Sequence, residues 1–263
     1  MILLLDLGNT NLDVGVYSQG QIIANFKTHS DKLKSESEYR GIIYRFLKDS
    51  NIKFTKIEGA ILSSVVPLLT KKISKAVANL LNRECLVVSK NLRSGLKIQI
   101  DNPSELGADL LCLAVGANET YKSDTIVIDF GTCTKVIYAS KDKAFKGCVI
   151  FPGIEVMAAS LEQKAAQLYE TDLYCTQKVL GKNTSDSICS GIINGTCYSV
   201  ISFVNNIVKE YNLTDYKVIF SGGNAEVVKP LLLKEGYTYD PYLAFKGLYL
   251  IYKLNQGEKY ASK

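Results

Sequence analysis

The chain has 263 residues, of which 47% are hydrophobic and 22% are charged, a composition typical of globular proteins and not of disordered or fibrous ones. At roughly 150 residues per domain, this length predicts two domains. Lys and Arg number 31 against 26 Asp and Glu, a formal net charge of +5, and no run of five like charges occurs. The charge pattern therefore gives no support to a nucleic-acid groove or a membrane-binding patch and leaves a mild attraction for small anions.

The first half of the chain alternates between apolar strands and amphipathic helices. Its opening, Met1 to Leu5, is a short apolar run that Asp6 interrupts, too short for a signal peptide or a membrane span, so we expect a cytoplasmic protein. The elements expected next are strands near 12–17 and 21–27, a helix near 35–48, a strand at 59–63, a helix from Pro67 to about 82, and strands near 86–89 and 96–100.

The second half continues the same alternation. The expected elements are a helix near 106–121, a strand at 126–128 followed by one at 135–139, a hairpin across 141–143, a helix after Gly153, a long helix near 185–211, a strand at 217–220 and a final helix beyond residue 224.

An internal repeat relates the two halves. The segment LLLDLGNT, residues 3–10, returns as IVIDFGTCT, residues 126–134. In each copy a buried strand ends at an Asp, a Gly then permits a tight turn, and hydroxyl or amide side chains follow. A second strand comes after each turn, so each half begins with a hairpin. The repeat predicts two similar α/β lobes, residues 1–114 and 115–263.

Two such turns can form a site for a polyphosphate and its metal. Backbone N–H groups and hydroxyls bind phosphate oxygens, and Asp is a hard oxygen ligand for magnesium. A single Asp-x-Gly turn is equally common in purely structural positions, whereas a duplicated one at strand ends is more specific. Neither G-x-x-x-x-G-K-[ST] nor G-x-G-x-x-G occurs, so a nucleotide site must be built differently.

The two loops, together with Ser221-Gly222-Gly223, resemble the phosphate and adenosine motifs of the actin-like ATPase and sugar-kinase superfamily. Within it, the ordered motifs are similar to those of type III pantothenate kinases. The matching segments are residues 6–10, 102–109, 129–132, 151–153 and 181–184. The resemblance covers about residues 1 to 250 and implies two duplicated ribonuclease H-like lobes with the nucleotide in a cleft between them.

The resemblance also implies an activity, the transfer of the γ-phosphoryl group of ATP to the primary hydroxyl of pantothenate, the first step toward coenzyme A. It implies magnesium, a monovalent cation (potassium or ammonium) and a homodimer. A long apolar helix near 188–208 offers a broad face for that dimer, although burial inside the second lobe explains the same face. No nucleic acid or membrane partner is expected.

Site residues carry over by position. The resemblance assigns nucleotide binding to Asp6, Leu7, Gly8, Asn9, Thr10, Asn11, Leu12, Asp13, Thr132, Gly222 and Gly223. It assigns substrate binding to Asn102, Gly107, Ala108, Asp109, Leu110 and Thr184. Asp6 would bind magnesium, directly or through water, and Asp129 the monovalent cation. Asp109 matches the general base, since one carboxylate can accept the alcohol proton late in phosphoryl transfer; a cap at a helix start is the alternative.

Three positions depart from the family pattern. Leu110 stands where the family has an Arg suited to the substrate carboxylate, Lys135 replaces a hydroxyl, and Ile137 replaces an acid. Lys135 either faces the ATP phosphates or the acceptor, and so compensates for the missing Arg, or lies exposed on the hairpin strand. Three functions stay open: a pantothenate kinase, a kinase of another small alcohol, and a nucleotide-binding regulatory relative.

Cysteine and histidine usage excludes other chemistry. The seven cysteines are scattered without a C-x-x-C pair, which favours reduced structural thiols over disulfides or a zinc site. The single histidine, His29, lies in a polar stretch typical of a loop, so a His-based catalytic triad is not expected.

Overall fold

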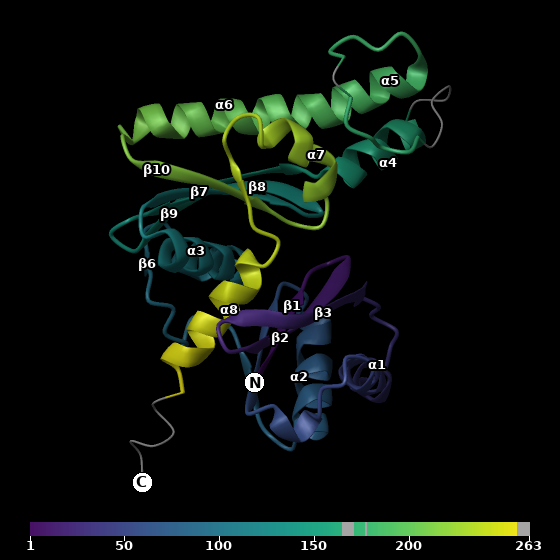
Figure 1. Cartoon of the computed structure of the whole chain (residues 1–263), viewed down its shortest axis with the longest axis vertical. Helices are drawn as coiled ribbons and strands as arrows, with labels where there is room; N and C mark the ends of the chain where they lie inside the picture. Colours follow the sequence, from purple (N-terminus) through teal and green to yellow (C-terminus); the bar gives the residue numbers. More distant parts are fainter. Residues whose placement is uncertain (165–170, 177, 257–263) are drawn as a thin grey trace. The chain divides into compact units, whose positions relative to one another are not determined.

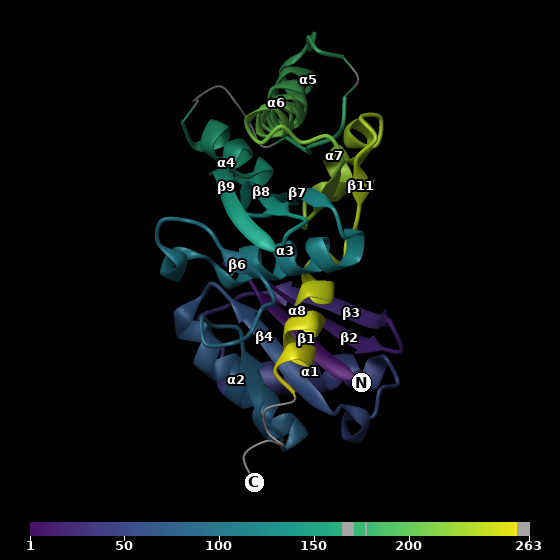
Figure 2. The ribbon, with the colours of Figure 1, turned by 90° about the vertical axis from the view of Figure 1, so that its left-hand side faces the viewer.

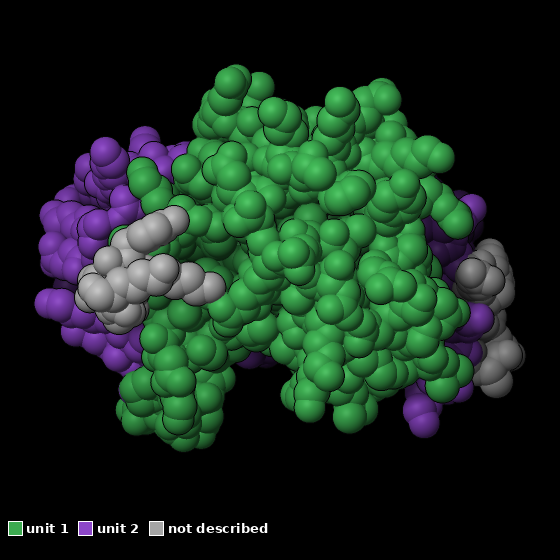
Figure 3. Space-filling view, turned by 90° about the horizontal axis from the view of Figure 1, so that it is seen from below, with its two compact units in different colours: residues 1–96, 101–116, 242–263 green, residues 97–100, 117–241 purple. Residues whose placement is uncertain are grey.

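The computed structural model describes residues 1–164, 171–176 and 178–256 and comprises two compact units. Unit 1 contains residues 1–96, 101–116 and the chain from 242 onward, and unit 2 contains residues 97–100 and 117–241; Figure 3 colours them separately. The predicted lobes, 1–114 and 115–263, remain a proposal about domains. In the predicted lobes and in the observed units alike, the chain passes from the first to the second near residue 115. The last helix was predicted in the second lobe, whereas it belongs to unit 1.

Unit 1 is built on a five-stranded sheet in the order β3-β2-β1-β4-β5, of which Figure 1 labels β1, β2 and β3. The first three strands are antiparallel to one another, whereas β4 is parallel to β1 and β5 to β4. The strands are β1 (Ile2–Leu7), β2 (Asn11–Ser18), β3 (Gln21–His29), β4 (Gly59–Ser64) and β5 (Cys85–Val87).

Helices cover both faces of this sheet. Because side chains alternate along a strand, Leu3 and Leu5 of β1 face one core and Ile2 and Leu4 face another. The first core is closed by α1 (Glu36–Asp49) and α2 (Pro67–Leu81), and the second by α3 (Ala108–Tyr121) and α8 (Leu243–Leu254). Figure 2 shows α8 lying against β1 and β4. Short 3-10 turns occupy Phe54–Lys56 and Pro103–Glu105.

Unit 2 repeats the same topology. Its sheet has the order β11-β10-β7-β8-β9-β6, in which β9-β8-β7-β10-β11 reproduces the order and the strand directions of unit 1, and β6 is added at the edge. The strands are β6 (Lys97–Ile98), β7 (Asp124–Phe130), β8 (Cys133–Ser140), β9 (Ala144–Pro152), β10 (Tyr216–Ser221) and β11 (Thr238–Tyr239). The duplication that the sequence predicted is therefore confirmed at the level of topology.

The helices of unit 2 include one long, interrupted element. They are α4 (Ile154–Lys164), α5 (Thr184–Cys189), α6 (Gly195–Glu210) and α7 (Ala225–Leu232), with a π-helical turn at Ser190–Asn194 between α5 and α6. The stretch Thr184–Glu210 is long and apolar enough to cross a membrane, but 56% of its most apolar window is buried within the protein, as in a core helix. Val200 and Val204, from the face considered for a dimer, lie in the core of unit 2.

Most of the predicted elements are confirmed within two or three residues of their expected ends. The strand expected at 96–100 is only two residues long, and the helix expected at 185–211 contains the π turn. The strand β11 and the helix α8 were not predicted.

Candidate active site

The first Asp-x-Gly loop follows β1 and is closed by its own backbone. The Gly8 amide donates a hydrogen bond to the Asn11 carbonyl over 2.8 Å, and the Ser30 hydroxyl donates to the Gly8 carbonyl over 2.7 Å. Asn9, at the tip of the turn, is exposed. The loop is thus held by its own backbone and by Ser30, which follows β3, and it presents its tip to a ligand.

Asp6 is the last residue but one of β1 and lies between two polar neighbours in the sheet. In the sheet it lies opposite Asp13 of β2 and Ser63 of β4. Asp13 forms an ion pair of 3.4 Å with Lys27, and both side chains of that pair are more than a third exposed. The pair is accessible to solvent and therefore weak enough to rearrange around a charged ligand.

The buried thiol of Cys112 lies within electrostatic reach of both Asp6 and Asp109. Burial raises the pKa of Cys112, on α3, well above its usual range; the negative charges of Asp6 and Asp109 raise it further, and the neighbouring Ser63 hydroxyl lowers it. Asp6 comes from β1 and Asp109 from the first turn of α3. Unit 1 therefore brings the predicted magnesium ligand and the predicted base to the same end of its sheet.

The Asp109 carboxylate bends back over the residue that precedes α3. A Cβ atom at Gly107 would lie 2.5 Å from Asp109 Oδ1, so glycine leaves the room that this carboxylate occupies. The Leu111 amide donates to the Gly107 carbonyl over 3.1 Å and starts the helix here. Gly107, predicted to bind substrate, thus positions the carboxylate at the positive end of a helix.

Two other predicted substrate residues have local roles. Leu110 is buried, with 7% of its surface exposed, so it offers little contact to a ligand. The Asn102 amide oxygen accepts hydrogen bonds from the Ser104 backbone and hydroxyl at 3.2 and 2.6 Å, and its amide nitrogen donates to Glu105. Asn102 caps the 3-10 turn that leads into α3.

The second Asp-x-Gly loop, between β7 and β8, is supported from outside. The Gly131 amide donates to the Cys133 carbonyl over 3.2 Å, and the Gly153 amide donates to the Thr132 carbonyl over 3.0 Å. A Cβ atom at Gly153 would lie 2.3 Å from the Gly131 carbonyl oxygen and 2.5 Å from that of Thr132. The motif at 151–153 therefore supports the second loop, whose Thr132 is exposed.

The predicted adenosine motif packs against the end of β7. Gly222 has a left-handed φ of +105°, and a Cβ atom there would lie 2.6 Å from the backbone of Phe130. The Asn224 amide donates to the Phe130 carbonyl over 2.9 Å. Only a glycine fits this contact, which joins the turn after β10 to the start of the second loop.

Asp129, at the end of β7, is bound by a lysine. Lys135 lies directly opposite on β8, and its Nζ atom is 2.8 Å from Asp129 Oδ2. The two side chains are 17% and 14% exposed. Lys135 therefore does not lie exposed on the hairpin strand, which was one of the two alternatives. Its ammonium group forms an ion pair with Asp129, the predicted cation ligand. Ile137, the other departure on this strand, is fully buried.

A pocket of about 900 Å³ opens in unit 2 beside the predicted substrate residue Thr184. Its walls come from α4, the segment 181–184, the first turn of α5 and the π turn. Val156, Met157 and Leu161 make one side apolar, and Lys182, Asn183 and Thr184 supply polar groups. Such a mixture suits a small organic ligand, and π turns frequently occur at functional sites.

The sequence profile of the type III pantothenate kinases matches residues 2–206, which include both loops, Asp109 and Thr184. This chain belongs to the type III pantothenate kinase family.

Solved structures place this family member in the actin-like fold. A conserved Campylobacter jejuni protein assigned to the Baf family of transcriptional activators is 20% identical, with 96% of this chain and 98% of that chain covered and a TM-score of 0.61. A Sinorhizobium meliloti protein described as a 2-dehydro-3-deoxygalactonokinase is 10% identical, with 98% of this chain and 97% of that chain covered and a TM-score of 0.59. MreB 5 of Spiroplasma citri, solved with AMPPNP, is 9% identical, with 100% of this chain and 98% of that chain covered and a TM-score of 0.53. These likenesses confirm the predicted two-lobe α/β fold class.

The site residues that the kinase resemblance predicts for this chain fall into two groups, one in each unit. Asp6, Asp13 and Asp109 lie in unit 1, whereas Asp129 and the segments of the second loop, the adenosine motif and Thr184 lie in unit 2. Sequence reasoning missed the α4 wall of the pocket and the support from Gly153. The segment at 151–153, one of the family-like motifs, was a signal for the latter, because a glycine at a strand end can mark a close backbone approach.

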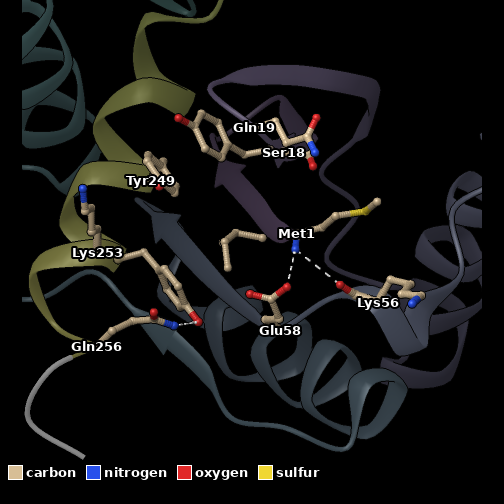
Figure 4. A pocket seen from close by; sticks show the side chains of 11 residues that line it. Met1, Ser18, Gln19, Lys56, Glu58, Tyr249, Lys253 and Gln256 are labelled. Carbon is tan, nitrogen blue, oxygen red and sulfur yellow. Dashed lines mark hydrogen bonds and ion pairs between the residues drawn. The ribbon is translucent and has the colours of Figure 1, made fainter.

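A second pocket, of about 460 Å³, lies in unit 1 where β1 begins (Figure 4). There the Met1 amino group forms an ion pair of 3.0 Å with Glu58, and the Tyr17 and Tyr249 rings stack with centroids 3.6 Å apart. The Asp6 loop leaves the other end of β1, and none of the predicted site residues lines this pocket. Among the described residues, no group of three or more His, Cys, Asp or Glu side chains is arranged to hold a metal ion.

Proposed function

We propose that this kinase phosphorylates the primary hydroxyl of pantothenate with ATP. The observation that carries the proposal is the family match over residues 2–206, which spans the predicted phosphate loops, base and acceptor residue. The family supports a phosphotransferase that uses ATP and a small-molecule acceptor; pantothenate, as the specific acceptor, is the finer step that we propose.

In this reaction each loop offers donors to phosphate oxygens through its backbone amides and an exposed side chain, Asn9 in the loop of unit 1 and Thr132 in the loop of unit 2. Asp6 and Asp13 are opposite one another and offer hard carboxylate oxygens, a donor set that fits magnesium, which commonly binds one or two carboxylates together with substrate phosphates. Bound magnesium would neutralise charge on the phosphates.

Asp109 receives the proton of the acceptor. The acceptor oxygen forms a bond to the γ-phosphorus while the bond from that phosphorus to the bridging oxygen of ADP breaks, and the hydroxyl proton passes to the Asp109 carboxylate. Thr184 and the apolar wall of Val156 and Leu161 suit an alcohol with a branched aliphatic portion and polar ends.

A second candidate function is phosphorylation of a small alcohol that carries no carboxylate. The observation that favours it is Leu110, which is apolar and buried at the position of the family's Arg. A charged hydrogen bond to a substrate carboxylate is worth about 1.5–3 kcal/mol, so its loss should weaken discrimination between charged and uncharged acceptors.

An ADP-release assay with ATP, magnesium and potassium separates these functions. Pantothenate-dependent release supports the proposal, provided that Asp109→Asn, purified in parallel, abolishes it. Equal or faster release with the pantothenate amide, which lacks the negative charge, favours the second candidate. ATP binding without release in the presence of either acceptor would contradict both and leave a regulatory nucleotide-binding protein.

We also propose a homodimer in the cytoplasm. The face of α6 that suggested a dimer packs into unit 2's own core, so support for the dimer comes from the family resemblance. Sedimentation that gives only monomers at micromolar concentration would contradict the dimer.

A further inference from the structure

The ion pair between Lys135 and Asp129 differs from an ordinary surface pair. The Nζ and Oδ2 atoms are 2.8 Å apart, and less than a fifth of either side chain is exposed. A carboxylate with this little access to water is costly unless a cation accompanies it. Asp129 therefore requires a positive charge at this place, and the chain itself supplies one.

The pair lies beside the second phosphate loop. Asp129 is separated from Gly131 by one residue, and a Cβ atom at Gly131 would lie 3.6 Å from Asp129 Oδ2, the oxygen that binds Lys135. On the other side of β7, Ser221 of β10 is the neighbour of Asp129 in the sheet and precedes the turn of the adenosine motif. The Lys135 charge thus lies beside both the second phosphate loop and the strand that leads to the adenosine motif.

The residues present do not fit the monovalent cation that the family resemblance implies for Asp129. A lysine ammonium is a compact cation with three donors, chemically close to a free ammonium ion. With Nζ already 2.8 Å from Oδ2, a second cation at the same oxygen would meet a like charge a few ångströms away. The hydroxyl that the family pattern has at position 135, an oxygen suited to potassium, is absent.

We infer that the Lys135 ammonium takes the place of the monovalent cation, so that ATP binding by this chain does not depend on potassium or ammonium. The inference rests on the proposed use of ATP at these loops. It also assigns Lys135 a role other than compensation for the missing Arg, because its charge is directed to Asp129.

Titration of the wild-type protein with magnesium ATP tests the inference without any acceptor. Calorimetry in potassium chloride and in choline chloride of equal ionic strength should give dissociation constants within about twofold of each other. An affinity that rises by about tenfold or more in potassium would overturn the inference. This measurement needs no variant, so it can overturn the inference even where a substitution impairs folding.

Lys135→Thr tests the converse. This variant leaves Asp129 and a new hydroxyl to an added cation, so we expect ATP affinity in choline to fall by about tenfold or more and potassium or ammonium to restore it to within about threefold of wild type. Melting temperature gives a second readout, since potassium should raise it in Lys135→Thr and leave it unchanged in wild type. Equal ATP binding and equal melting in both salts would mean that Asp129 is no cation site, which would overturn the inference.

Lys146→Thr is the matched control. Lys146 lies on β9 of the same sheet and donates to Gln99 over 2.6 Å, away from the loop. We expect wild-type ATP affinity in both salts. Failure to phosphorylate pantothenate would defeat the proposed function while leaving these ATP titrations interpretable, so the two failures are distinguishable.

Discussion

Asp109 is a single residue with two candidate roles, stabilisation of a helix and acceptance of a proton. Its carboxylate lies at the start of α3, where the helix dipole favours a negative charge by about 0.3–1 kcal/mol. It also shares the neighbourhood of Cys112 with Asp6. The first property is that of a helix-stabilising group, whereas the second fits a catalytic base next to a magnesium nucleotide.

Asp109→Asn distinguishes them. Asn has the same size and is tolerated at a helix start, but it accepts no proton, so we expect kcat to fall by about 100- to 10,000-fold while ATP affinity and melting temperature stay close to wild type. Single-turnover ADP formation and calorimetry measure the two effects. Turnover within a few-fold of wild type would show that Asp109 only stabilises the helix.

At the scale of the element, the junction of β9 and α4 supports a loop that belongs to a different hairpin. The amide of Gly153 is bonded to Thr132 in the turn between β7 and β8, and the backbones meet too closely for a side chain. The same junction begins the α4 wall of the large pocket. The junction of β9 and α4 therefore contacts the second loop and also lines the candidate acceptor pocket, both within unit 2.

Gly153→Ala should damage nucleotide binding more than folding. Its methyl group would push against the Gly131 and Thr132 carbonyls, and such overpacking typically costs about 1–3 kcal/mol. We expect calorimetry to show ATP affinity reduced by about tenfold or more, with the far-UV spectrum preserved.

Gly195→Ala is the corresponding control. Apart from its chain neighbours and the backbone of its own helix, no atom lies within 4 Å of a Cβ at Gly195, which begins α6. The variant should therefore be as stable as wild type or gain up to about 1 kcal/mol, with unchanged ATP affinity. Normal ATP binding by Gly153→Ala would contradict the role of this contact.

At the scale of the whole molecule, several tyrosines of unit 2 link stability to alkaline pH. Burial, with the nearby charge of Asp240, raises the pKa of Tyr121 from 10.0 to about 12, and burial raises that of Tyr237 to about 12. Burial and a 2.8 Å hydrogen bond to Asp124 raise the pKa of Tyr138 as well. In each case the folded protein holds the phenol proton more tightly than the unfolded chain does.

Stability should therefore be complete below pH 10, where both states are protonated, and should be lost as the pH rises from about 10 to 12 and the unfolded state releases its protons first. Urea denaturation at pH 9 and pH 11 measures the loss. Tyr121→Phe should reduce it, and the exposed Tyr198→Phe serves as control. An equal loss in wild type and Tyr121→Phe would contradict the assignment.

The local part of the fold was predictable from the sequence. Hairpins, strands and most helices follow from apolar periodicity over short stretches, and the repeated Asp-x-Gly turn identified the duplication that both sheets confirm. The pairing of Lys135 with Asp129 was within reach too, because the length of a hairpin turn sets the register of its strands.

The sequence by itself thus determined the fold class, the two turns and the residues that resemble a kinase site, since these depend on neighbours along the chain. Only the tertiary structure decided that α8 completes the core of unit 1, that Leu110 is buried, that the apolar face of α6 belongs to its own unit, and that α4 and the π turn enclose a pocket beside Thr184. Each of these depends on contacts between residues far apart in sequence. Burial of an apolar side chain lowers the free energy wherever a partner surface is found, so an apolar pattern reveals that a face will be covered without revealing by what.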